Sequence, residues 1–570
     1  MSKNMLFVSD LKDMLNKTRE LYGERPGYKI KLEEGKYQVY THNEIRDMVD
    51  YLGTALINLG LKNKRIAVIG ENRYEWELAY LSVVCGTGTV VPLDKALPAN
   101  ELEELVERSE VEAIFYSKKY EEIVEKIKYS EKNKLKHLIS MDSDIHKEGI
   151  YSQKELIEKG KEFVDAGDKS FIDAKINPEE MSIMLFTSGT TSKSKVVALY
   201  HKNKVSNVME FASVLDINSS DRILSFLPLH HVFECTVGML YSLYIGAQRS
   251  FCEGIRHIVE NLNEYQITFA SFVPAIYESM HKTILKNLEK EGKLEAVRKL
   301  MDENKDKTMA QKKEIFKDIH NVFGGQIKLF ISGAAALEKE VEEDFRAWGI
   351  NLCQGYGLTE TSPVIGVETN ENFRVGSIGK PLPHIQAKIE DANKEGMGEL
   401  VVKGPNVMLG YYNDEEATKE VLEDGWFRTG DLAKIDEDGY IFICGRKKSV
   451  IVLKNGKNIF PEEMEALVNK IEGVKESFIF GKQQSDDKDD IKINVKIIFD
   501  REIIQEAYKV TTDDEIYKVL AEKVKEVNQI MPKYKAIRGI LISEEPLLKT
   551  TTSKIKRQAN IEIIENENKK

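Results

Sequence analysis

The chain has 570 residues, more than one hydrophobic core normally supports, so we expect at least two domains. Its net charge of −12 argues against a nucleic-acid-binding protein, because phosphate backbones are bound by concentrated Lys and Arg. A composition of 42% hydrophobic and 31% charged residues excludes a disordered chain. No apolar run reaches the roughly 18 residues that span a bilayer.

The cysteines and the first residues of the chain indicate the cellular compartment in which the protein is expected. Five cysteines are scattered without a CxxC pair, which favours reduced thiols over disulfides or a zinc site. Residues 1–14 contain Asp10 and Asp13 and have no small-residue cleavage site, so they do not match a signal peptide. We therefore expect a cytoplasmic protein.

Helical and strand patterns alternate over the first part of the chain. In residues 41–60, Ile45, Val49 and Leu52 recur at helical spacing, and Gly60 suits a left-handed C-terminal cap. The elements expected next are a strand at 65–70, a helix at 75–85, a strand at 89–94, a helix at 99–109 and strands at 111–117, 222–229, 267–275 and 327–337. This alternation predicts βαβ units, and therefore an α/β fold with parallel-rich sheets covered by helices.

The composition and pattern of the sequence change twice from the middle of the chain onward. Residues 281–320 are rich in Lys and Glu with few large apolar side chains, which predicts a solvated helical insertion. After Gly376, short strands joined by Gly-Asp turns predict a β-rich subdomain. The end of the chain then predicts a small α+β domain. We therefore expect an N-terminal domain over 1–446 and a C-terminal domain over 447–570.

The segment FTSGTTSKSKVV (186–197) follows a predicted apolar strand and holds six hydroxyl side chains around Gly189. Hydroxyls, backbone N–H groups, Lys193 and Lys195 are the donors that a phosphate-binding loop brings together. The segment matches neither the Walker pattern GxxxxGK[ST] nor GxGxxG. By itself it is either a phosphate loop or an ordinary surface turn.

Four later segments carry isolated charged or aromatic side chains beside glycines or hydroxyls. They are GYGLTETSP (355–363) with Tyr356, Thr359 and Glu360 in a glycine-flanked loop, GWFRTGDLAKIDEDGY (425–440) with Asp431 after a Thr-Gly turn, GRKKSVIVLKNGKNIFPEEME (445–465) with Arg446, and PLLKTTTSKIKR (546–557) with Lys549 and Lys554. Each alone is typical of a solvated surface. Five such segments in this order are not expected by chance.

With these segments, residues 40–557 resemble the adenylate-forming superfamily of acyl-CoA synthetases, luciferases and peptide-synthetase adenylation domains. The resemblance implies ATP, Mg²⁺ and coenzyme A as cofactors, a large domain that binds ATP and the acyl group, and a small mobile C-terminal domain with the catalytic lysine. It also implies two half-reactions. A carboxylate attacks the α-phosphorus of ATP to give an acyl adenylate and pyrophosphate, and a thiol then takes the acyl group.

The resemblance assigns roles to individual residues. The catalytic residues would be Lys554, Glu360, Thr359 and His231, and Glu360 and Thr187 would hold Mg²⁺. The phosphates of ATP would be bound by Thr187, Ser188, Gly189, Thr190, Thr191, Ser192, Lys193 and Lys195, the adenine by Gly333, Ala334, Ala335, Gln354, Gly355 and Tyr356, and the ribose by Asp431 and Arg446. Lys448 would be the hinge of the C-terminal domain, and Gly456 lies in the loop expected to face coenzyme A.

Two features resemble fatty acid–CoA ligases that act on longer chains. LPLHHVFE (227–234) places His231 at the family's histidine position, and Gly357 stands where acetyl-specific relatives have a tryptophan. These features favour an AMP-forming ligase for a medium- or long-chain fatty acid.

Other readings stay open. The acyl group could pass to a carrier-protein thiol instead of coenzyme A. Ser192 and Ser553, where the family has glycine, suggest a nucleotide- or acyl-binding protein with impaired catalysis. A peripheral contact with the inner membrane face is compatible with a substrate that partitions into bilayers. A homodimer is open as well, and no nucleic-acid partner is expected.

Overall fold

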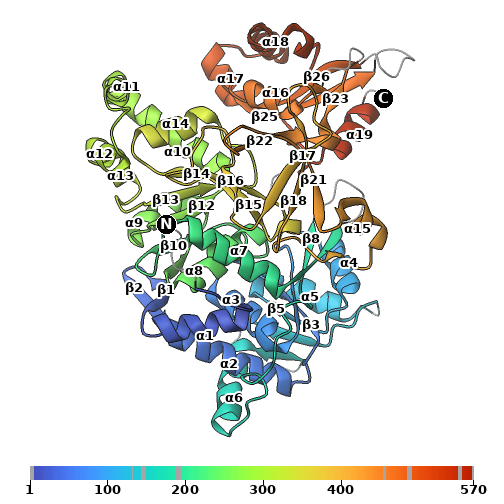
Figure 1. Cartoon of the computed structure of the whole chain (residues 1–570). Coiled ribbons are helices and arrows are strands. Elements are labelled where there is room, and N and C mark those ends of the chain that lie inside the picture. Colours follow the sequence, from blue (N-terminus) through green and yellow to red (C-terminus); the bar gives the residue numbers. More distant parts are fainter. Residues whose placement is uncertain are drawn as a thin grey trace.

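The computed structural model describes residues 6–567 except 131, 143–148, 188–193, 454–457, 484–490 and 550–554. The architecture contains two large sheets, the sheet of the predicted β-rich subdomain (called the β-rich sheet below) and a small C-terminal sheet. Figure 1 shows the N-terminal elements in the lower part of the molecule and the C-terminal elements at the top. The predicted α/β class, with a β-rich part and a C-terminal α+β part, is confirmed.

The first large sheet has the strand order β19-β9-β8-β4-β3-β5-β6-β7. Its pairs are parallel from β8 to β7 and antiparallel at β8–β9 and β9–β19. The strands are β3 (Arg65–Ile69), β4 (Thr89–Pro92), β5 (Ala113–Tyr116), β6 (His137–Ser140), β7 (Ile150–Ser152), β8 (Met181–Thr187), β9 (Lys195–Tyr200) and β19 (Gly410–Tyr411). The strands predicted at 65–70, 89–94 and 111–117 therefore lie side by side.

The second large sheet has the order β16-β15-β14-β13-β12-β10-β11-β1-β2. It is parallel from β14 to β1 and antiparallel at both ends. The strands are β1 (Pro26–Glu33), β2 (Lys36–Thr41), β10 (Arg222–Ser225), β11 (Gln248–Phe251), β12 (Phe269–Phe272), β13 (Leu329–Ser332), β14 (Leu352–Gly357), β15 (Val364–Val367) and β16 (Lys380–Pro381).

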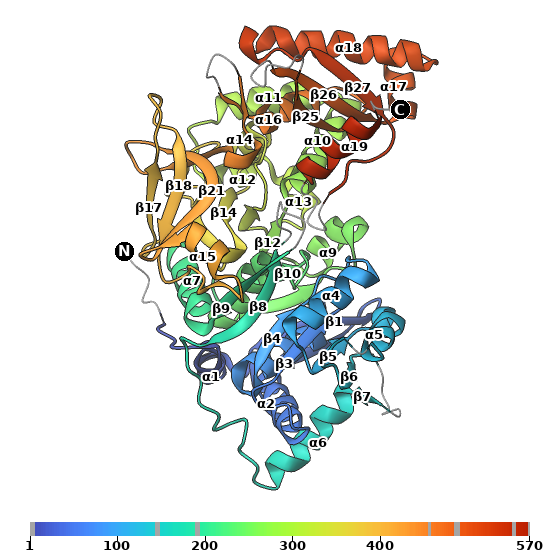
Figure 2. The same cartoon turned by 90° about the vertical axis from the view of Figure 1, so that its right-hand side faces the viewer.

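Helices connect and cover these two sheets (Figures 1 and 2). They are α1 (Leu11–Tyr22), α2 (His42–Asn58), α3 (Tyr74–Ser82), α4 (Ala99–Ser109), α5 (Glu121–Lys128), α6 (Gln153–Asp165), α7 (His201–Val214), α8 (Tyr241–Ile245), α9 (Ile258–Glu264), α10 (Pro274–Lys290), α11 (Leu294–Glu303), α12 (Met309–Ile315), α13 (Lys317–Val322) and α14 (Lys339–Ala347). The largest core cluster joins α2, α3, α7 and α8 to strands of both sheets. One continuous core therefore fixes the two sheets relative to each other.

The β-rich sheet follows the second large sheet. Its order is β17-β18-β21-β20, with β22 paired to β21. Its elements are β17 (Gln386–Glu390), β18 (Gly398–Lys403), α15 (Glu415–Val421), β20 (Leu422–Glu423), β21 (Trp426–Ile435) and β22 (Ile441–Arg446).

The C-terminal part has its own core cluster, built on a three-stranded sheet. Its elements are β23 (Ile451–Val452), β24 (Asn458–Ile459), α16 (Pro461–Val468), β25 (Val474–Gln483), β26 (Ile491–Phe499), α17 (Arg501–Tyr508), α18 (Asp513–Ile530), β27 (Gly539–Ser543) and α19 (Arg557–Glu567). Figure 2 shows these elements above the β-rich sheet and the second large sheet. Among the described residues, no helix is both long and apolar enough to cross a membrane.

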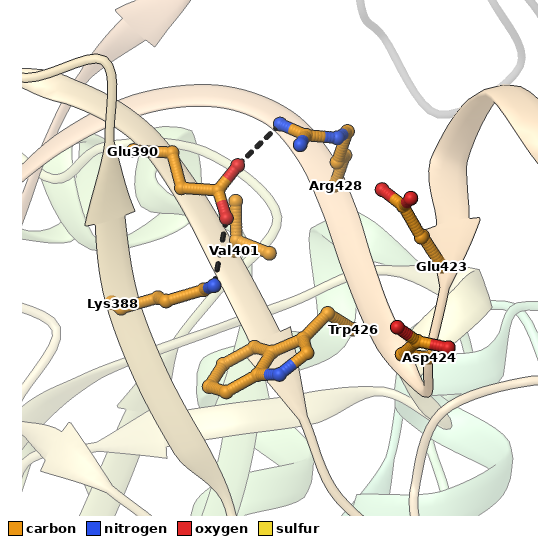
Figure 3. Close-up of a pocket in the computed structure, with 7 residues that line it drawn as sticks. All are labelled: Lys388, Glu390, Val401, Glu423, Asp424, Trp426 and Arg428. Atoms are coloured by element: carbon orange, nitrogen blue, oxygen red, sulfur yellow. Dashed lines mark ion pairs between the residues drawn. The ribbon is translucent and has the colours of Figure 1, made fainter.

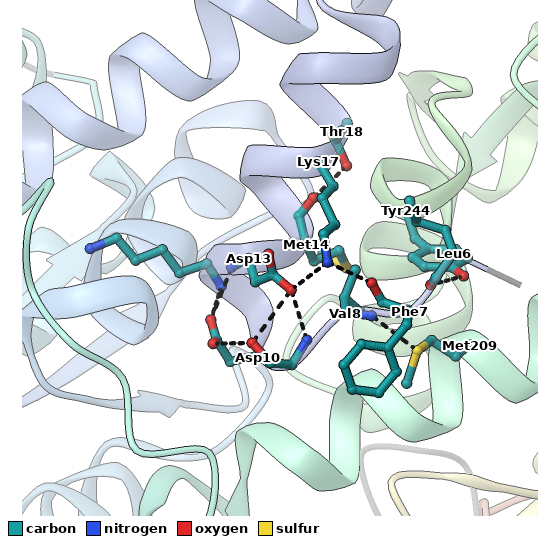
Figure 4. Close-up of polar contacts among 12 residues, drawn as sticks. Leu6, Phe7, Val8, Asp10, Asp13, Met14, Lys17, Thr18, Met209 and Tyr244 are labelled. Carbon is teal, nitrogen blue, oxygen red and sulfur yellow. Dashed lines mark hydrogen bonds and ion pairs between the residues drawn. The ribbon is translucent and has the colours of Figure 1, made fainter.

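The first described residues run along α7 and α8 (Figure 4). The Tyr244 hydroxyl donates to the Leu6 carbonyl oxygen at 2.6 Å, and the Val8 amide donates to the Met209 sulfur at 3.3 Å. Asp10 then caps the amino end of α1 with its side chain. These contacts fasten the start of the chain to helices of the largest core.

Residues 281–320 form helices as predicted, but they are not simply solvated. Phe316 and Ile319 belong to the second core cluster. Arg298 Nη1 lies 2.6 and 2.8 Å from the two carboxylate oxygens of Asp344 in α14, and His281 Nε2 lies 2.7 Å from the same carboxylate. The insertion is therefore anchored by one apolar face and by a partly buried ion pair, although its other face is rich in charge.

Candidate functional site

The predicted phosphate loop connects two strands of the first large sheet. Thr187 ends β8, Lys195 begins β9, and Thr187 Oγ1 donates to the Lys195 carbonyl oxygen at 3.4 Å. Arg108 Nη2 from α4 donates to the Ser194 carbonyl oxygen at 2.7 Å. The predicted loop residues between these strands lie outside the described residues: Ser188, Gly189, Thr190, Thr191, Ser192 and Lys193. The loop leaves the sheet at the carboxyl end of β8, where α/β sheets commonly bind ligands.

Glu360 and Lys195 meet at one aromatic ring, that of Tyr411. The Tyr411 hydroxyl donates to Glu360 Oε1 at 3.0 Å, and Lys195 Nζ lies 4.4 Å from the centre of the ring. Backbone bonds fix the arrangement, because Tyr411 pairs with Val197 in β9 and the Met408 amide donates to the Glu360 carbonyl oxygen at 2.8 Å. Burial, and then the Glu360 carboxylate, raise the pKa of Tyr411, so its hydroxyl is a donor at neutral pH.

Buried amide side chains hold the turn that carries Glu360, a 3₁₀-helix over Thr359–Thr361. Asn207 of α7 donates to the Val364 carbonyl oxygen at 2.7 Å and accepts from the Val364 amide at 3.0 Å. Asn406 Nδ2 donates to the carbonyl oxygen of the last residue of the turn at 2.9 Å. Because buried backbone groups need partners, these amides determine where the turn lies.

Asp431 is almost fully buried and is shared by two predicted nucleotide-binding side chains. Arg446 Nε lies 2.7 Å from its Oδ1, and the Tyr356 hydroxyl donates to its Oδ2. The Thr-Gly turn predicted before Asp431 is not a turn. Residues 426–435 are one strand, in which a bulge against β18 with Gly430 at φ +71° sets the position of the aspartate. Burial, and then the Asp431 carboxylate, raise the pKa of Tyr356.

The predicted adenine frame is formed by adjacent strands. β13 and β14 pair so that the turn after β13 lies beside Gln354, and Gln354 Oε1 accepts from the Leu337 amide at 3.2 Å. Gly333 is buried, and a Cβ added there would lie 2.9 Å from an aromatic ring. Ala334–Ala335 are exposed. Gly355 and the tyrosine after it belong to β14, so the glycine-flanked loop that the sequence predicts begins only after residue 357.

His231 lies half-buried between β10 and the next helical segment, where the Phe233 amide donates to its Nδ1 at 3.3 Å. The neighbouring His230, which has no predicted role, has its Nε2 3.4 Å from Asp94 Oδ1. Asn72 fixes this segment by donating to its backbone carbonyl at residue 227 at 2.6 Å. The ring of His231 is therefore held partly by its own turn.

The predicted residues of the C-terminal part are mostly beyond what the structure describes. Lys448 is exposed in a 3₁₀-helix over Lys447–Ser449, directly after β22. Gly456 and Lys554 lie outside the described residues. The described ends of the lysine segment pair, because Lys549 and Ile555 form an isolated antiparallel bridge.

The donors suit a magnesium ion that is shared with phosphates. Within the described ranges, no three His, Cys, Asp or Glu side chains gather in a way that could hold a metal ion. Glu360 offers a carboxylate and Thr187 a hydroxyl, and Mg²⁺ is commonly bound by one or two carboxylates together with substrate phosphates. These residues fit Mg²⁺ as part of a nucleotide complex.

Sequence reasoning missed three residues that shape the site: Tyr411, Asn207 and Asn406. An asparagine within the apolar helical stretch 205–211 could have been noticed as a buried polar group that needs a partner. Tyr411 carries no local signal, because its role depends on the pairing of β19 with β9.

A cavity of about 170 Å³ lies on the β-rich sheet, away from these residues (Figure 3). Lys388 and Arg428 both pair with Glu390, at 2.7 and 2.6 Å, and Lys388 Nζ lies 4.2 Å from the ring centre of Trp426. Both basic side chains of the cavity are therefore paired with Glu390, and none of the predicted site residues lines it.

Comparison with known proteins places the chain in a family. The family model for the AMP-binding enzyme matches residues 20–412, and that for the AMP-binding enzyme C-terminal domain matches residues 448–567. The chain belongs to the AMP-binding enzyme family. The first range contains the predicted phosphate loop, Tyr356 and Glu360, and the second contains Lys554, whereas Asp431 and Arg446 lie between the two ranges.

Individual relatives agree with this membership. Fatty acyl-CoA synthetase B of Dictyostelium discoideum is 28% identical over 84% of this chain and 76% of that protein. Fatty acyl-CoA synthetase A of the same organism is 30% identical over 79% and 71%. The crystal structure of the anthranilate CoA ligase AuaEII in complex with anthranoyl-AMP has a TM-score of 0.78, 18% sequence identity and 98% coverage of both chains, which establishes the shared fold of this AMP-binding enzyme.

Proposed function

We propose that the chain is an AMP-forming ligase that activates a medium- or long-chain fatty acid with ATP and transfers it to coenzyme A. The observation that carries this proposal is the convergence around Asp431 and Tyr411. Asp431 joins Tyr356 and Arg446, which come from different motifs, and Tyr411 joins Glu360 to Lys195 of the phosphate-loop segment. Membership of the AMP-binding enzyme family and relatives named fatty acyl-CoA synthetase support the same conclusion.

In the first half-reaction a carboxylate oxygen of the acid bonds to the α-phosphorus of ATP, and the bond to pyrophosphate breaks. Two anions must approach each other, so positive charge fixed in advance is the main catalytic device. Lys195 and the loop 188–193 would bind the departing phosphates, Thr359 the α-phosphate, and Lys554 the attacking carboxylate. Mg²⁺ held by Glu360 and Thr187 would supply additional charge neutralisation.

The nucleoside would be held by the cluster around Asp431. Asp431 and Arg446 would bind the ribose hydroxyls, and Tyr356 would lie against the adenine, beside Gln354 and the turn 333–335. Because Asp431 already accepts from Tyr356 and Arg446, its carboxylate is oriented before a nucleotide binds. Such orientation lowers the entropy cost of binding.

In the second half-reaction the thiol sulfur of coenzyme A bonds to the acyl carbonyl carbon and AMP leaves. This step does not need Lys554, so the C-terminal part would reorient about Lys448 and bring the loop with Gly456 towards the thiol. His231 would line the entrance of the acyl chain. A peripheral membrane contact would follow from the partitioning of long-chain acids into bilayers.

The test combines a substrate panel with one variant. We expect the purified chain, supplied with Mg²⁺-ATP and acids of two to eighteen carbons, to exchange pyrophosphate and to form CoA thioesters with the longer acids. Lys554→Ala should lower exchange by about 10²–10³-fold but still convert supplied acyl adenylate and coenzyme A to thioester. Lys556→Ala, an exposed neighbour, is the matched control.

Each contrary outcome has a defined meaning. Absence of exchange with every acid would contradict the proposal. Exchange without CoA thioester would indicate a carrier-protein thiol as the acceptor. Equal loss of both half-reactions in Lys554→Ala would contradict the role of that lysine.

A further inference from the structure

Tyr411 lies between two groups that the proposed function assigns to Mg²⁺-ATP. Its hydroxyl donates to Glu360 Oε1 at 3.0 Å, and its ring lies 4.4 Å from Lys195 Nζ. One side chain therefore contacts both the carboxylate proposed to hold the metal and the lysine at the edge of the phosphate loop. Neither contact is made by residues close in sequence, since Tyr411 is 51 residues from Glu360.

The tyrosine itself is fixed by the fold. Tyr411 pairs with Val197 in β9. A second contact fixes its backbone, because the Tyr411 amide donates to Thr418 Oγ1 at 2.9 Å. β9 is the strand that follows the phosphate loop in the sequence, so the position of the Tyr411 ring is fixed relative to that strand. The backbone of Glu360 is fixed separately by the Met408 amide, three residues before Tyr411.

The contact leaves one carboxylate oxygen for a ligand. Within the described part of the chain, Glu360 Oε2 has no hydrogen-bond or ion-pair partner, whereas Oε1 accepts from Tyr411. A half-buried carboxylate with a single donor on one oxygen has a restricted rotamer but keeps acceptor capacity on the other oxygen. This is the arrangement expected of a metal ligand whose orientation is set by a neighbouring donor.

We propose that Tyr411 is a positioning residue that orients Glu360 for Mg²⁺-ATP and links that carboxylate to the strand of the phosphate loop. The inference rests on the proposed function. Tyr411 acts through Glu360 and need not touch the nucleotide. Its hydroxyl carries the effect on Glu360, and its ring separately supports the Lys195 side chain by a cation–π contact.

The test uses Tyr411→Phe, which keeps the ring beneath Lys195 and removes only the hydroxyl. A hydrogen bond to a charged group contributes about 1.5–3 kcal/mol, so the dissociation constant for ATP in Mg²⁺ should rise about tenfold or more. In EDTA the same constant should be unchanged. Binding is measured by titration calorimetry, which does not depend on turnover, and thermal unfolding confirms that the variant folds.

Tyr412→Phe is the matched control. Tyr412 is the next residue, and its hydroxyl bonds instead to Arg65 Nη2 at 2.6 Å. This variant removes one tyrosine hydroxyl from the same segment without reaching Glu360, so its ATP affinity in Mg²⁺ should match that of the unmodified chain.

A double-mutant cycle with Glu360→Ala separates positioning from a general structural effect. If Tyr411 acts through Glu360, Tyr411→Phe should cause no further loss of ATP affinity once Glu360 is removed. Equal losses in both backgrounds, or unchanged affinity in Tyr411→Phe while Glu360→Ala is impaired, would overturn the inference alone. If the unmodified chain binds ATP no better in Mg²⁺ than in EDTA, the proposed function falls, and this inference with it.

Discussion

Two buried carboxyl groups contact Gln354 of the proposed adenine site. Glu342 of α14 and Glu368 after β15 are both fully buried. The Gln354 amide donates to Glu368 Oε2 at 2.9 Å, and the Gln354 side chain donates to Glu342 Oε2 at 3.1 Å. Burial, and then the Glu342 carboxylate, raise the pKa of Glu368 to about 9. The folded chain therefore keeps a proton at this pair at neutral pH.

This proton makes stability depend on pH. An acid whose pKa is higher in the folded chain binds more protons when folded, so the free energy of unfolding falls as the pH rises from about 4.5 towards about 9. Glu342→Gln supplies an amide that can donate to Glu368, which should lower the pKa of Glu368. We expect this variant to lose less stability than the unmodified chain between pH 5 and 8.5, as measured by thermal unfolding.

Glu343→Gln serves as the control for this experiment. It makes the same charge change at the next residue of α14, where the side chain is exposed. Its pH dependence should follow that of the unmodified chain. A variant at Glu342 with an unchanged pH profile would show that the pair does not hold the proton.

At the scale of elements, the junction of β14 and β15 decides how the site is built. The register shifts between Tyr356 and Gly357, which lies opposite Val364. A Cβ on Gly357 would lie 1.8 Å from the Pro363 carbonyl oxygen. Gly357, interpreted from the sequence as a feature of ligases for longer acyl chains, therefore has a second explanation, since the backbone alone requires glycine here.

Gly357→Ala should destabilise this junction. The added methyl group meets backbone rather than a flexible side chain, so we expect a loss of about 1–3 kcal/mol in the free energy of unfolding, measured by denaturant titration. Gly355→Ala on the same strand is the control for stability, because its Cβ would meet its nearest neighbour at an ordinary 3.6 Å. Equal stability of the two variants would contradict the steric explanation.

At the scale of the whole molecule, an ion pair connects the C-terminal part to the large domain. Lys470, after α16, pairs with Glu338 at the start of α14 at 3.1 Å. Both side chains are substantially exposed, at 48% and 31%. Exposed pairs of this kind contribute little to stability, which is compatible with the reorientation of the C-terminal part proposed above.

Reversal of this charge should weaken the arrangement by a small amount. For Lys470→Glu we expect trypsin cleavage at Lys447 and Lys448 to accelerate about 1.5- to 5-fold, as an exposed ion pair of about 0.2–1 kcal/mol implies. The swap Lys470→Glu with Glu338→Lys should restore the original rate.

The control is Lys475→Glu, because Lys475 pairs with Asp500 of the same domain at 2.9 Å. It should leave cleavage between the domains unchanged. An equal acceleration in both single variants would indicate general loosening of the C-terminal domain rather than loss of the contact with α14.

Periodicity predicted the elements whose signal is local. The helix expected over 41–60 is α2, with Thr41 in a capping box and Gly60 at φ +80°. Prediction failed where long-range pairing overrides local chemistry. The Thr-Gly pair before Asp431 reads as a turn but lies within a ten-residue strand, because pairing with β18 and β22 supplies the backbone bonds that a turn would lack.

The α/β class, the order of the elements and the residue types available for nucleotide chemistry could be predicted without the fold, because they depend on short-range periodicity and on motif spacing. Which side chains meet could not be predicted in this way. Asp431 joins Tyr356 and Arg446, and Tyr411 joins Glu360 and Lys195, although most of these residues lie far apart in the sequence. Such contacts follow from sheet order and burial, which no local pattern encodes.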